Sequence, residues 1–183
     1  QALQAGVKLV QHRSKLTDDL PRYQEAVALR DLCAAHGALF IVNDRVDLAL
    51  AVEADGVHLG QGDLPPAQAR RLLGPDRLIG RSTHAPAQLQ QAMADGCDYA
   101  GVGPLQATPT KPGREPVGLD YLRQAAQIAT IPHYAIGGVD VQLLPALLEA
   151  GGPHCRVAVV RAVMEAADPA AAARQLLELL ADG

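Results

Sequence analysis

The sequence has few cysteines and no long apolar run. Its three cysteines, Cys33, Cys97 and Cys155, are scattered, and no C-x-x-C pair occurs. Neither a disulfide framework nor a zinc site is therefore indicated. No apolar run approaches the roughly 18 residues that span a bilayer, and no signal peptide is recognisable at the start. We expect a cytoplasmic protein with reduced thiols and no membrane partner.

The sequence also lacks an excess of positive charge. Its formal net charge is −4, which provides no basic field for nucleic acid, so this class of partner is not expected. A chain of 183 residues with 49% hydrophobic content is long enough for one well-buried domain and too short for two ordinary ones. We expect a single domain over residues 1–183. Whether it forms a homo-oligomer stays open.

Short apolar runs alternate seven times with amphipathic helical patterns. The runs are continuously apolar, as in parallel strands buried on both faces. They are Val7–Gln11, Ala38–Asn43, Gly56–Gly60, Arg77–Arg81, Asp98–Gly103, Pro132–Gly137 and Cys155–Val160. Helices are predicted over Asp18–His36, Arg45–Glu53, Pro65–Leu73, Ala85–Asp95, Gly118–Ala129, Asp140–Ala150 and Asp168–Ala181. The first helix is expected to carry one apolar stripe formed by Leu20, Tyr23, Ala26, Val27 and Leu32.

Seven such units fit either a (β/α)8 TIM barrel without its first strand or a doubly wound open sheet. The opening residues favour the barrel. Gln1–Gly6 reads as the last turn of a helix that ends at Gly6 and leads into the first apolar run. Such a helix implies a preceding strand. We therefore expect strands two to eight of an α/β barrel, with the remaining strand pairing between Val7–Gln11 and Cys155–Val160.

Polar side chains follow the predicted strands at their carboxyl ends, where barrel enzymes hold their chemistry. The most informative segment is Val102–Lys111, because its hydroxyls and its ammonium group suit a phosphate. Successive strand ends add Gln11, Arg13, Ser14, Lys15, Asn43, Asp44, Arg45, His58, Gly60, Gln61, Asp63, Ser82, Thr83, His84, Gly137 and Gly138. Carboxylates among cations suit a divalent cation bridged to a phosphorylated ligand.

Each of these residues also has a structural interpretation. Asp44 could cap the helix that starts at Arg45, and Asp63 could cap the helix at Pro65. His58 could be a hydrogen-bonded core histidine. These separate interpretations explain poorly why so many anion-binding groups follow successive strands.

Seven segments together resemble thiamine-phosphate synthases, in the order and spacing of that family. They are Gln11–Lys15 (QHRSK), Ile41–Arg45 (IVNDR), Asp55–Pro65 (DGVHLGQGDLP), Ile79–His84 (IGRSTH), Gly101–Pro104 (GVGP), Thr108–Lys111 (TPTK) and Ala135–Val139 (AIGGV). The resemblance implies a (β/α)8 barrel. It also implies a transferase, thiamine-phosphate diphosphorylase, that joins 4-amino-5-hydroxymethyl-2-methylpyrimidine diphosphate to a thiazole phosphate and releases diphosphate.

The resemblance also implies the roles of individual residues. Asp44 and Asp63 correspond to the ligands of a Mg²⁺ cofactor, and Arg13, Lys15 and Lys111 to the cations that stabilise the leaving group. The pyrimidine diphosphate is expected to contact Gln11, Arg13, Ser14, Lys15, Asn43, Ser82 and Lys111. The thiazole phosphate is expected to contact Thr108, Pro109, Thr110, Lys111 and Gly138, the last through its backbone N–H.

The chain departs from the family pattern at three positions. Ser14 stands where the family often has Glu, His12 replaces a larger apolar or aromatic residue, and Arg161 stands where the last phosphate-binding segment often has Ser. Two other functions stay open: a TenI-like thiazole tautomerase and a non-catalytic thiazole-phosphate-binding regulator on the same fold. The complete set of predicted diphosphate and Mg²⁺ residues favours the synthase.

Overall fold

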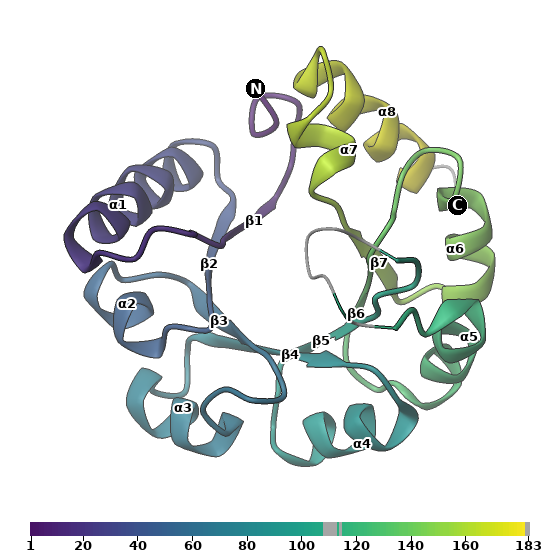
Figure 1. The fold of residues 1–183 in the computed structure, drawn as a ribbon, viewed down its shortest axis with the longest axis horizontal. Coiled ribbons are helices and arrows are strands. Elements are labelled where there is room, and N and C mark those ends of the chain that lie inside the picture. The colour runs from purple at the N-terminus through teal and green to yellow at the C-terminus, as the bar shows by residue number, and fades with distance from the viewer. Residues whose placement is uncertain (108–112, 114, 182–183) are drawn as a thin grey trace.

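Seven parallel strands form one sheet in which each strand pairs with the next in chain order (Figure 1). The structure is a computed structural model, and it describes residues 1–181 apart from 108–112 and 114. The strands are β1 (Leu9–His12), β2 (Leu39–Asn43), β3 (Gly56–Leu59), β4 (Leu78–Thr83), β5 (Tyr99–Val102), β6 (His133–Ile136) and β7 (Cys155–Ala158). Every predicted apolar run thus overlaps a strand, although β1 and β4 extend beyond their runs to His12 and Thr83.

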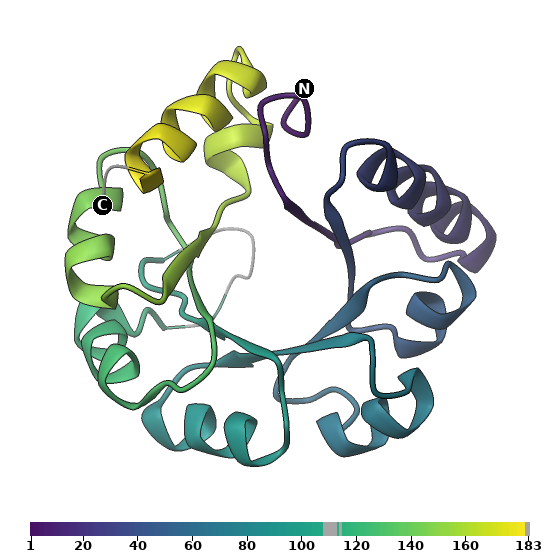
Figure 2. The ribbon, with the colours of Figure 1, turned by 180° about the vertical axis from the view of Figure 1, so that it is seen from behind.

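The helices form an outer layer around the curled sheet (Figures 1 and 2). They are α1 (Asp19–Ala35), α2 (Val46–Ala51), α3 (Pro66–Leu73), α4 (Pro86–Ala94), α5 (Gly118–Ile128), α6 (Leu144–Gly151), α7 (Arg161–Met164) and α8 (Pro169–Ala181). The short helix α7 is the only one of these that the apolar pattern does not predict. Among the described residues, no helix has both the length and the apolar character that crossing a bilayer requires.

The strand order excludes the doubly wound alternative. A doubly wound sheet starts in the middle and reverses direction, so its strand order differs from its chain order. Here the order is β1 to β7 without a break, and the helices lie on the outer side, as in a barrel. Within the described residues, β1 pairs only with β2 and β7 pairs only with β6. The observed architecture is thus an α/β half-barrel of seven strands.

The N-terminal residues form a turn beside α8, on the open side of the ring (Figure 1). The Ala5 N–H donates to the Gln1 carbonyl at 3.0 Å, a helix-type bond, and Gly6 has a φ of 107°. These features match the predicted helical turn that ends at Gly6. Ala2 and Ala5 pack against an apolar cluster that includes Ala173 and Leu176 of α8.

The apolar core lies between the sheet and the helices, in three clusters. The first contains Phe40 and Val57 with α1, α2 and α3, and the second contains Ala100 and Ala135 with α4, α5 and α6. The third joins α6, α7 and α8 to the N-terminal turn. The outward-facing residues of each strand therefore make the core. Their inward-facing neighbours are left to line the inside of the half-barrel.

Helix α1 buries only part of the predicted stripe. Leu20 is 67% exposed, Leu32 is 50% exposed and Tyr23 is 41% exposed, whereas Ala26 and Cys33 are buried. The prediction was right for Ala26 and for Val27, which packs against the first cluster. It was wrong for Leu20, Tyr23 and Leu32, because it weighted side-chain size. The small buried residues let α1 lie close to the sheet, and they continue a stripe at helical spacing through Leu29 back to Arg22.

Gly80 makes room for the ring of Tyr99 inside the half-barrel. A Cβ atom on Gly80 would lie 2.1 Å from Cζ of Tyr99. Gly80→Ala should therefore lower the free energy of unfolding by about 1–3 kcal/mol, the usual cost of overpacking. Chemical denaturation measures the change. Gly62→Ala is the matched control, because nothing lies within 4 Å of a Cβ there; an equal loss in both variants would contradict the steric explanation.

His133 makes the stability of the fold dependent on pH. It is 1% exposed, and its Nε2 lies 3.1 Å from the carbonyl oxygen of Gly151. Burial lowers the pKa of His133 below its ordinary value of 6.5. As the pH is lowered, His133 is protonated in the unfolded chain before it is protonated in the folded one. The contribution of neutral His133 to the free energy of unfolding is therefore fully present above pH 6.5 and is lost as the pH falls below that value.

We therefore expect the melting temperature of the wild type to decrease when the pH is lowered from 7 to 5. His133→Gln should be less stable at pH 7 and should lose less stability over the same interval. Thermal unfolding at half-unit steps of pH measures both slopes. Identical slopes would show that His133 is not the titrating group.

Candidate functional site

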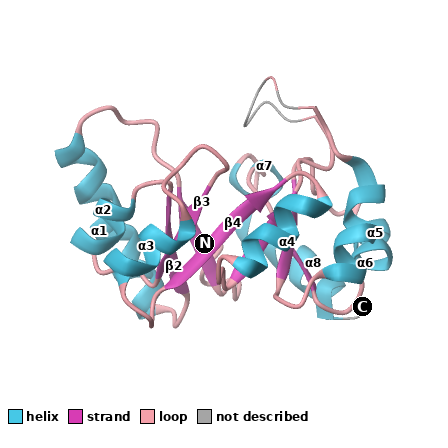
Figure 3. Ribbon diagram, turned by 90° about the horizontal axis from the view of Figure 1, so that it is seen from below, coloured by secondary structure: helices cyan, strands magenta, loops and turns pink. Residues whose placement is uncertain are grey.

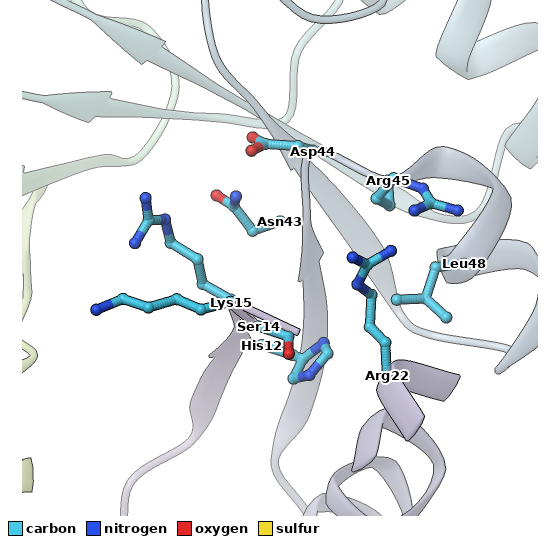
Figure 4. Close-up of a pocket in the computed structure, with 9 residues that line it drawn as sticks. His12, Ser14, Lys15, Arg22, Asn43, Asp44, Arg45 and Leu48 are labelled. Atoms are coloured by element: carbon cyan, nitrogen blue, oxygen red, sulfur yellow. The ribbon is translucent and has the colours of Figure 1, made fainter. Parts of the chain in front are cut away.

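Several of the predicted cations and polar groups meet in a pocket between the first two strand-to-helix loops (Figure 4). These loops project from the side of the sheet towards which the strand arrows point (Figure 3). The pocket has a volume of about 460 Å³ and is lined by His12, Arg13, Ser14, Lys15, Arg22, Asn43, Asp44, Arg45 and Leu48. Five predicted site residues are thus brought together: Arg13, Ser14, Lys15, Asn43 and Asp44.

Lys15 and Asp44 face the same side of the pocket. In Figure 4 the Lys15 side chain extends away from α1, and the Asp44 carboxylate and the Asn43 amide point towards the same space. Lys15 and Asp44 are exposed, whereas Asn43 is 8% exposed at the end of β2. An ammonium group, an amide and a carboxylate on one wall can bind an anion together with a cation.

Asp44 is held by an unusual backbone turn. Its φ is 65°, in the left-handed region that non-glycine residues seldom adopt. The Asp44 N–H donates to the His58 carbonyl at 2.8 Å, and the Arg45 N–H donates to the Asn43 carbonyl at 2.8 Å. Arg45, not Asp44, is the N-cap residue of α2. Strained residues of this kind cluster at functional sites, where the surrounding structure holds them.

Asp63 closes the loop that follows β3. Its Oδ2 accepts a hydrogen bond from the Gly60 N–H at 2.6 Å, and the side chain is half-buried. The N-cap residue of α3 is Pro65, so Asp63 does not take the predicted capping position. The loop is also tied to the next strand, because Gln61 Nε2 donates to the Ser82 carbonyl at 2.6 Å.

Ser82 belongs to a hydrogen-bonded chain inside the half-barrel. Its hydroxyl lies 2.9 Å from Nε2 of His58, and Nδ1 of His58 lies 3.2 Å from the hydroxyl of Tyr99. Burial raises the pKa of Tyr99, so the phenol keeps its proton. The structural interpretation of His58 as a hydrogen-bonded buried histidine agrees with these contacts. The same contacts fix the position of Ser82.

The remaining predicted residues lie outside this pocket. Gln11 is exposed on β1, Ser82 lies on β4, and Asp63 and Gly138 follow β3 and β6. Gly138 has a φ of 76°, and a Cβ there would lie 2.7 Å from the Cβ of Gln106, so the position requires glycine. Thr108, Pro109, Thr110 and Lys111 lie outside the described residues.

Three residues of the pocket, His12, Arg22 and Leu48, are not among the predicted strand-end groups. Leu48 is buried in α2, and Arg22 comes from α1, in line with Ala26, Leu29 and Cys33. In the sequence, Arg22 stands at helical spacing from Ala26, Leu29 and Cys33. A charged residue at such a position of an otherwise apolar stripe is the signal that could have marked Arg22 as a candidate site residue. Arg45 was noted at a strand end without a role. Two carboxylates, Asp47 and Asp19, hydrogen-bond Arg45 and raise its pKa.

The described residues contain no cluster of three or more His, Cys, Asp or Glu side chains that could hold a metal ion. This finding does not conflict with a Mg²⁺ ion of the expected kind. Such an ion usually takes only one or two carboxylates and completes its shell with water and phosphate oxygens. Asp44 and Asp63, which follow neighbouring strands, have the required donor chemistry.

Comparisons with known proteins identify the relatives of this chain. The thiamine monophosphate synthase family matches residues 1–163. A thiamine-phosphate synthase of Synechococcus sp. (strain WH7803) is 59% identical over 179 residues, which are 98% of this chain and 50% of the relative. One from Gloeobacter violaceus is 57% identical over 182 residues, covering 100% of this chain and 53% of the relative. The chain thus spans about half the length of the curated relatives it matches.

Solved structures support the same relationship. A thiamine phosphate pyrophosphorylase from Pyrococcus furiosus superposes with a TM-score of 0.90 at 35% identity, covering 99% of this chain and 86% of that one. A 3-hexulose-6-phosphate synthase from Salmonella typhimurium superposes with a TM-score of 0.71 at 17% identity, covering 96% of this chain and 87% of that one. The second likeness concerns the fold alone.

Proposed function

Because the chain belongs to the thiamine monophosphate synthase family, we propose that it joins 4-amino-5-hydroxymethyl-2-methylpyrimidine diphosphate to a thiazole phosphate. The products are thiamine phosphate and diphosphate, and the activity is that of a transferase. The observation that carries the proposal is the pocket in which Arg13, Lys15, Asn43 and Asp44 meet. It combines the charges that a leaving diphosphate requires.

The same membership supports finer proposals about the molecule. We propose that an eighth strand between β1 and β7 completes a (β/α)8 barrel, since both strands have one edge without a partner among the described residues. We also propose that residues 1–183 form a single domain and act in the cytoplasm on small molecules. These proposals concern a chain about half as long as its curated relatives.

The mechanism proceeds through departure of the diphosphate. The reacting carbon is attached to an electron-rich aminopyrimidine, which stabilises positive charge as the carbon–oxygen bond breaks. Arg13 and Lys15 stabilise the negative charge that develops on the leaving diphosphate. The thiazole nitrogen then donates its electron pair to the same carbon. The chain therefore acts by positioning and electrostatics, and no covalent nucleophile is needed.

Asp44 and Asp63 would hold Mg²⁺ in this proposal. Such an ion would supply positive charge that stabilises the leaving diphosphate. The negative charge of the two carboxylates would also complement the positive charge of Arg13 and Lys15. The site would therefore offer both signs of charge to a diphosphate that binds together with Mg²⁺. Asn43 and Ser82 add uncharged hydrogen-bonding groups to the same diphosphate.

The thiazole phosphate is assigned to the segment after β5 and to Gly138. Thr108, Pro109, Thr110 and Lys111 are assigned from the resemblance, and they lie outside the described residues. The positive φ of Gly138 turns the backbone after β6 and supports its role as an N–H donor. Lys111 would contact both substrates.

Product analysis tests the proposal. Purified protein with both substrates and Mg²⁺ should form thiamine phosphate, detected by mass spectrometry, and omission of either substrate should abolish it. A thiazole tautomerase would instead isomerise its thiazole substrate with no pyrimidine present. A regulator would bind the thiazole phosphate without turnover. Either of these two outcomes would contradict the proposal.

A further inference from the structure

Arg22 occupies a position where α1 otherwise buries small or apolar residues. The inward stripe of this helix runs from Arg22 through Ala26 and Leu29 to Cys33, at spacings of four, three and four residues. Ala26 and Cys33 are buried in the first core cluster, and Leu29 packs against it. The Arg22 side chain is only 15% exposed. A guanidinium held in this place requires polar partners.

The partners of Arg22 belong to the loop between β1 and α1 and to the first residue of α1. Its Nη2 donates to the carbonyl oxygens of Leu16 and Thr17, the latter at 3.2 Å. Its Nη1 donates to Oδ1 of Asp19 at 2.8 Å. The planar guanidinium can serve all three acceptors at once, which an ammonium group on a flexible stem cannot do with the same geometry.

Glu25, one turn further along α1, holds the beginning of the same loop. Its Oε2 lies 2.8 Å from Nε2 of His12, and hydrogen bonds from His12 and Ser14 lower the pKa of Glu25. The Ser14 hydroxyl in turn accepts the Leu16 N–H at 3.2 Å. Hydrogen bonds to Arg22 and Glu25 of helix α1 therefore hold residues 12, 14, 16 and 17 in place.

Two of the predicted diphosphate ligands, Arg13 and Lys15, lie between the residues that α1 holds, whereas Ser14, also predicted as a ligand, is itself held by Glu25. Arg13 and Lys15 alternate along the chain with His12 and Ser14, and side chains of an extended segment point alternately to opposite sides. Figure 4 shows this for the labelled residues: Lys15 extends away from His12 and Ser14, and Arg22 rises from α1 on the opposite side. The contacts that hold His12 and Ser14 on one side of the loop therefore orient Arg13 and Lys15 towards the pocket on the other side.

A second link joins this loop to the one that carries Asn43 and Asp44. Oδ1 of Asp19 accepts from Arg22 and also from Nη1 of Arg45 at 3.1 Å. Arg45 is itself fixed by Asp47, with 2.5 Å between Nη2 and Oδ2. The carboxylate of Asp19 thus links Arg22 to the loop that carries Asn43 and Asp44.

We propose that Arg22 is a positioning residue that orders the β1–α1 loop and thereby holds Arg13 and Lys15 ready for a diphosphate. The inference rests on the proposed function for the identity of the ligand. Ion pairs as exposed as Asp19, at 78%, contribute little to global stability. The contacts of Arg22 therefore act on the local geometry of the loop. A loop that is already ordered lowers the entropy cost of binding an anion.

Arg22→Gln tests this role against a matched control. Arg123 on α5 forms the same kind of i,i+3 pair, with Asp120 at 2.7 Å, and is not one of the residues that line the pocket. Binding of inorganic diphosphate with Mg²⁺ is measured by calorimetry, which requires no turnover. We expect Arg22→Gln to weaken binding about tenfold or more, because small misplacement of binding groups has large effects. Arg123→Gln should bind as the wild type does.

Two further measurements separate positioning from other roles. Arg22→Lys keeps the charge and loses the planar fork, so it should remain impaired; full rescue by Lys would show that Arg22 acts on the diphosphate directly as a charge. The thermal midpoints of Arg22→Gln and Arg123→Gln should agree within a few degrees. In the steady state, Arg22→Gln should raise the KM for the pyrimidine diphosphate and leave that for the thiazole phosphate unchanged.

Equal diphosphate affinities of Arg22→Gln and Arg123→Gln would overturn the inference, even if the wild type forms thiamine phosphate. Wild-type protein that does not bind diphosphate would overturn it as well. If the wild type binds diphosphate and Arg22→Gln weakens it, but no thiamine phosphate forms, the inference stands and the proposed function fails.

Discussion

Asp44→Asn will reduce the turnover of thiamine phosphate formation by about 100-fold, which corresponds to about 2.7 kcal/mol of transition-state stabilisation. The substitution removes a negative charge and keeps the shape of the side chain. Asn also tolerates the left-handed backbone that Asp44 adopts, with a φ of 65°, so the turn should persist. Asp63→Asn should reduce turnover in the same way. Steady-state rates over a range of Mg²⁺ concentrations measure the effect.

Asp120→Asn is the control for this prediction, because its exposed carboxylate lies on α5 and pairs with Arg123. Its rate should match that of the wild type. If Asp44→Asn and Asp63→Asn both keep near wild-type rates at low Mg²⁺, the assignment of these carboxylates to a metal ion is wrong. Unchanged thermal midpoints would show that reduced rates do not arise from unfolding.

Lys15→Ala will lower kcat/KM for the pyrimidine diphosphate by about 10- to 150-fold, the effect of losing a hydrogen bond to a charged group worth about 1.5–3 kcal/mol. The KM for the thiazole phosphate should not change, because that phosphate is assigned to the segment after β5 and to Gly138. Part of the loss should appear in kcat, since charge grows on the leaving group in the transition state.

Lys8→Ala is the matched control, since Lys8 is an exposed lysine that precedes β1, whereas Lys15 follows it. Initial rates with each substrate varied in turn separate the two constants. A change confined to the KM of the thiazole phosphate would place Lys15 at the other substrate. The diphosphate would then depend on Arg13 and the metal ion.

The number and type of the strands could be predicted because apolar runs and helical patterns are local properties. The strand Gly56–Leu59, for example, lies inside the predicted run Gly56–Gly60. The inward face of α1 could not be predicted from side-chain size. Cys33 is buried in place of Leu32 because the helix lies close to the sheet, and that distance depends on residues far along the chain. The short helix α7 could not be predicted for a different reason: four residues are too few to show an apolar pattern.

Within the candidate site, the groups that follow single strands could be predicted, because a parallel sheet brings the carboxyl ends of its strands to one side. Arg13, Lys15, Asn43 and Asp44 meet in this way. The role of Arg22 could not be predicted, because it depends on the path of a loop that returns over the first turn of α1. The pairing of Ser82 with His58 likewise depends on strand register, which places Gly80 opposite His58.

The ratio of the two products tests the central claim most directly. Purified protein is supplied with both substrates and Mg²⁺, and thiamine phosphate and diphosphate are quantified in the same samples over time. The account predicts that they accumulate in equal amounts. Formation of neither product, or conversion of the thiazole phosphate without release of diphosphate, would contradict it.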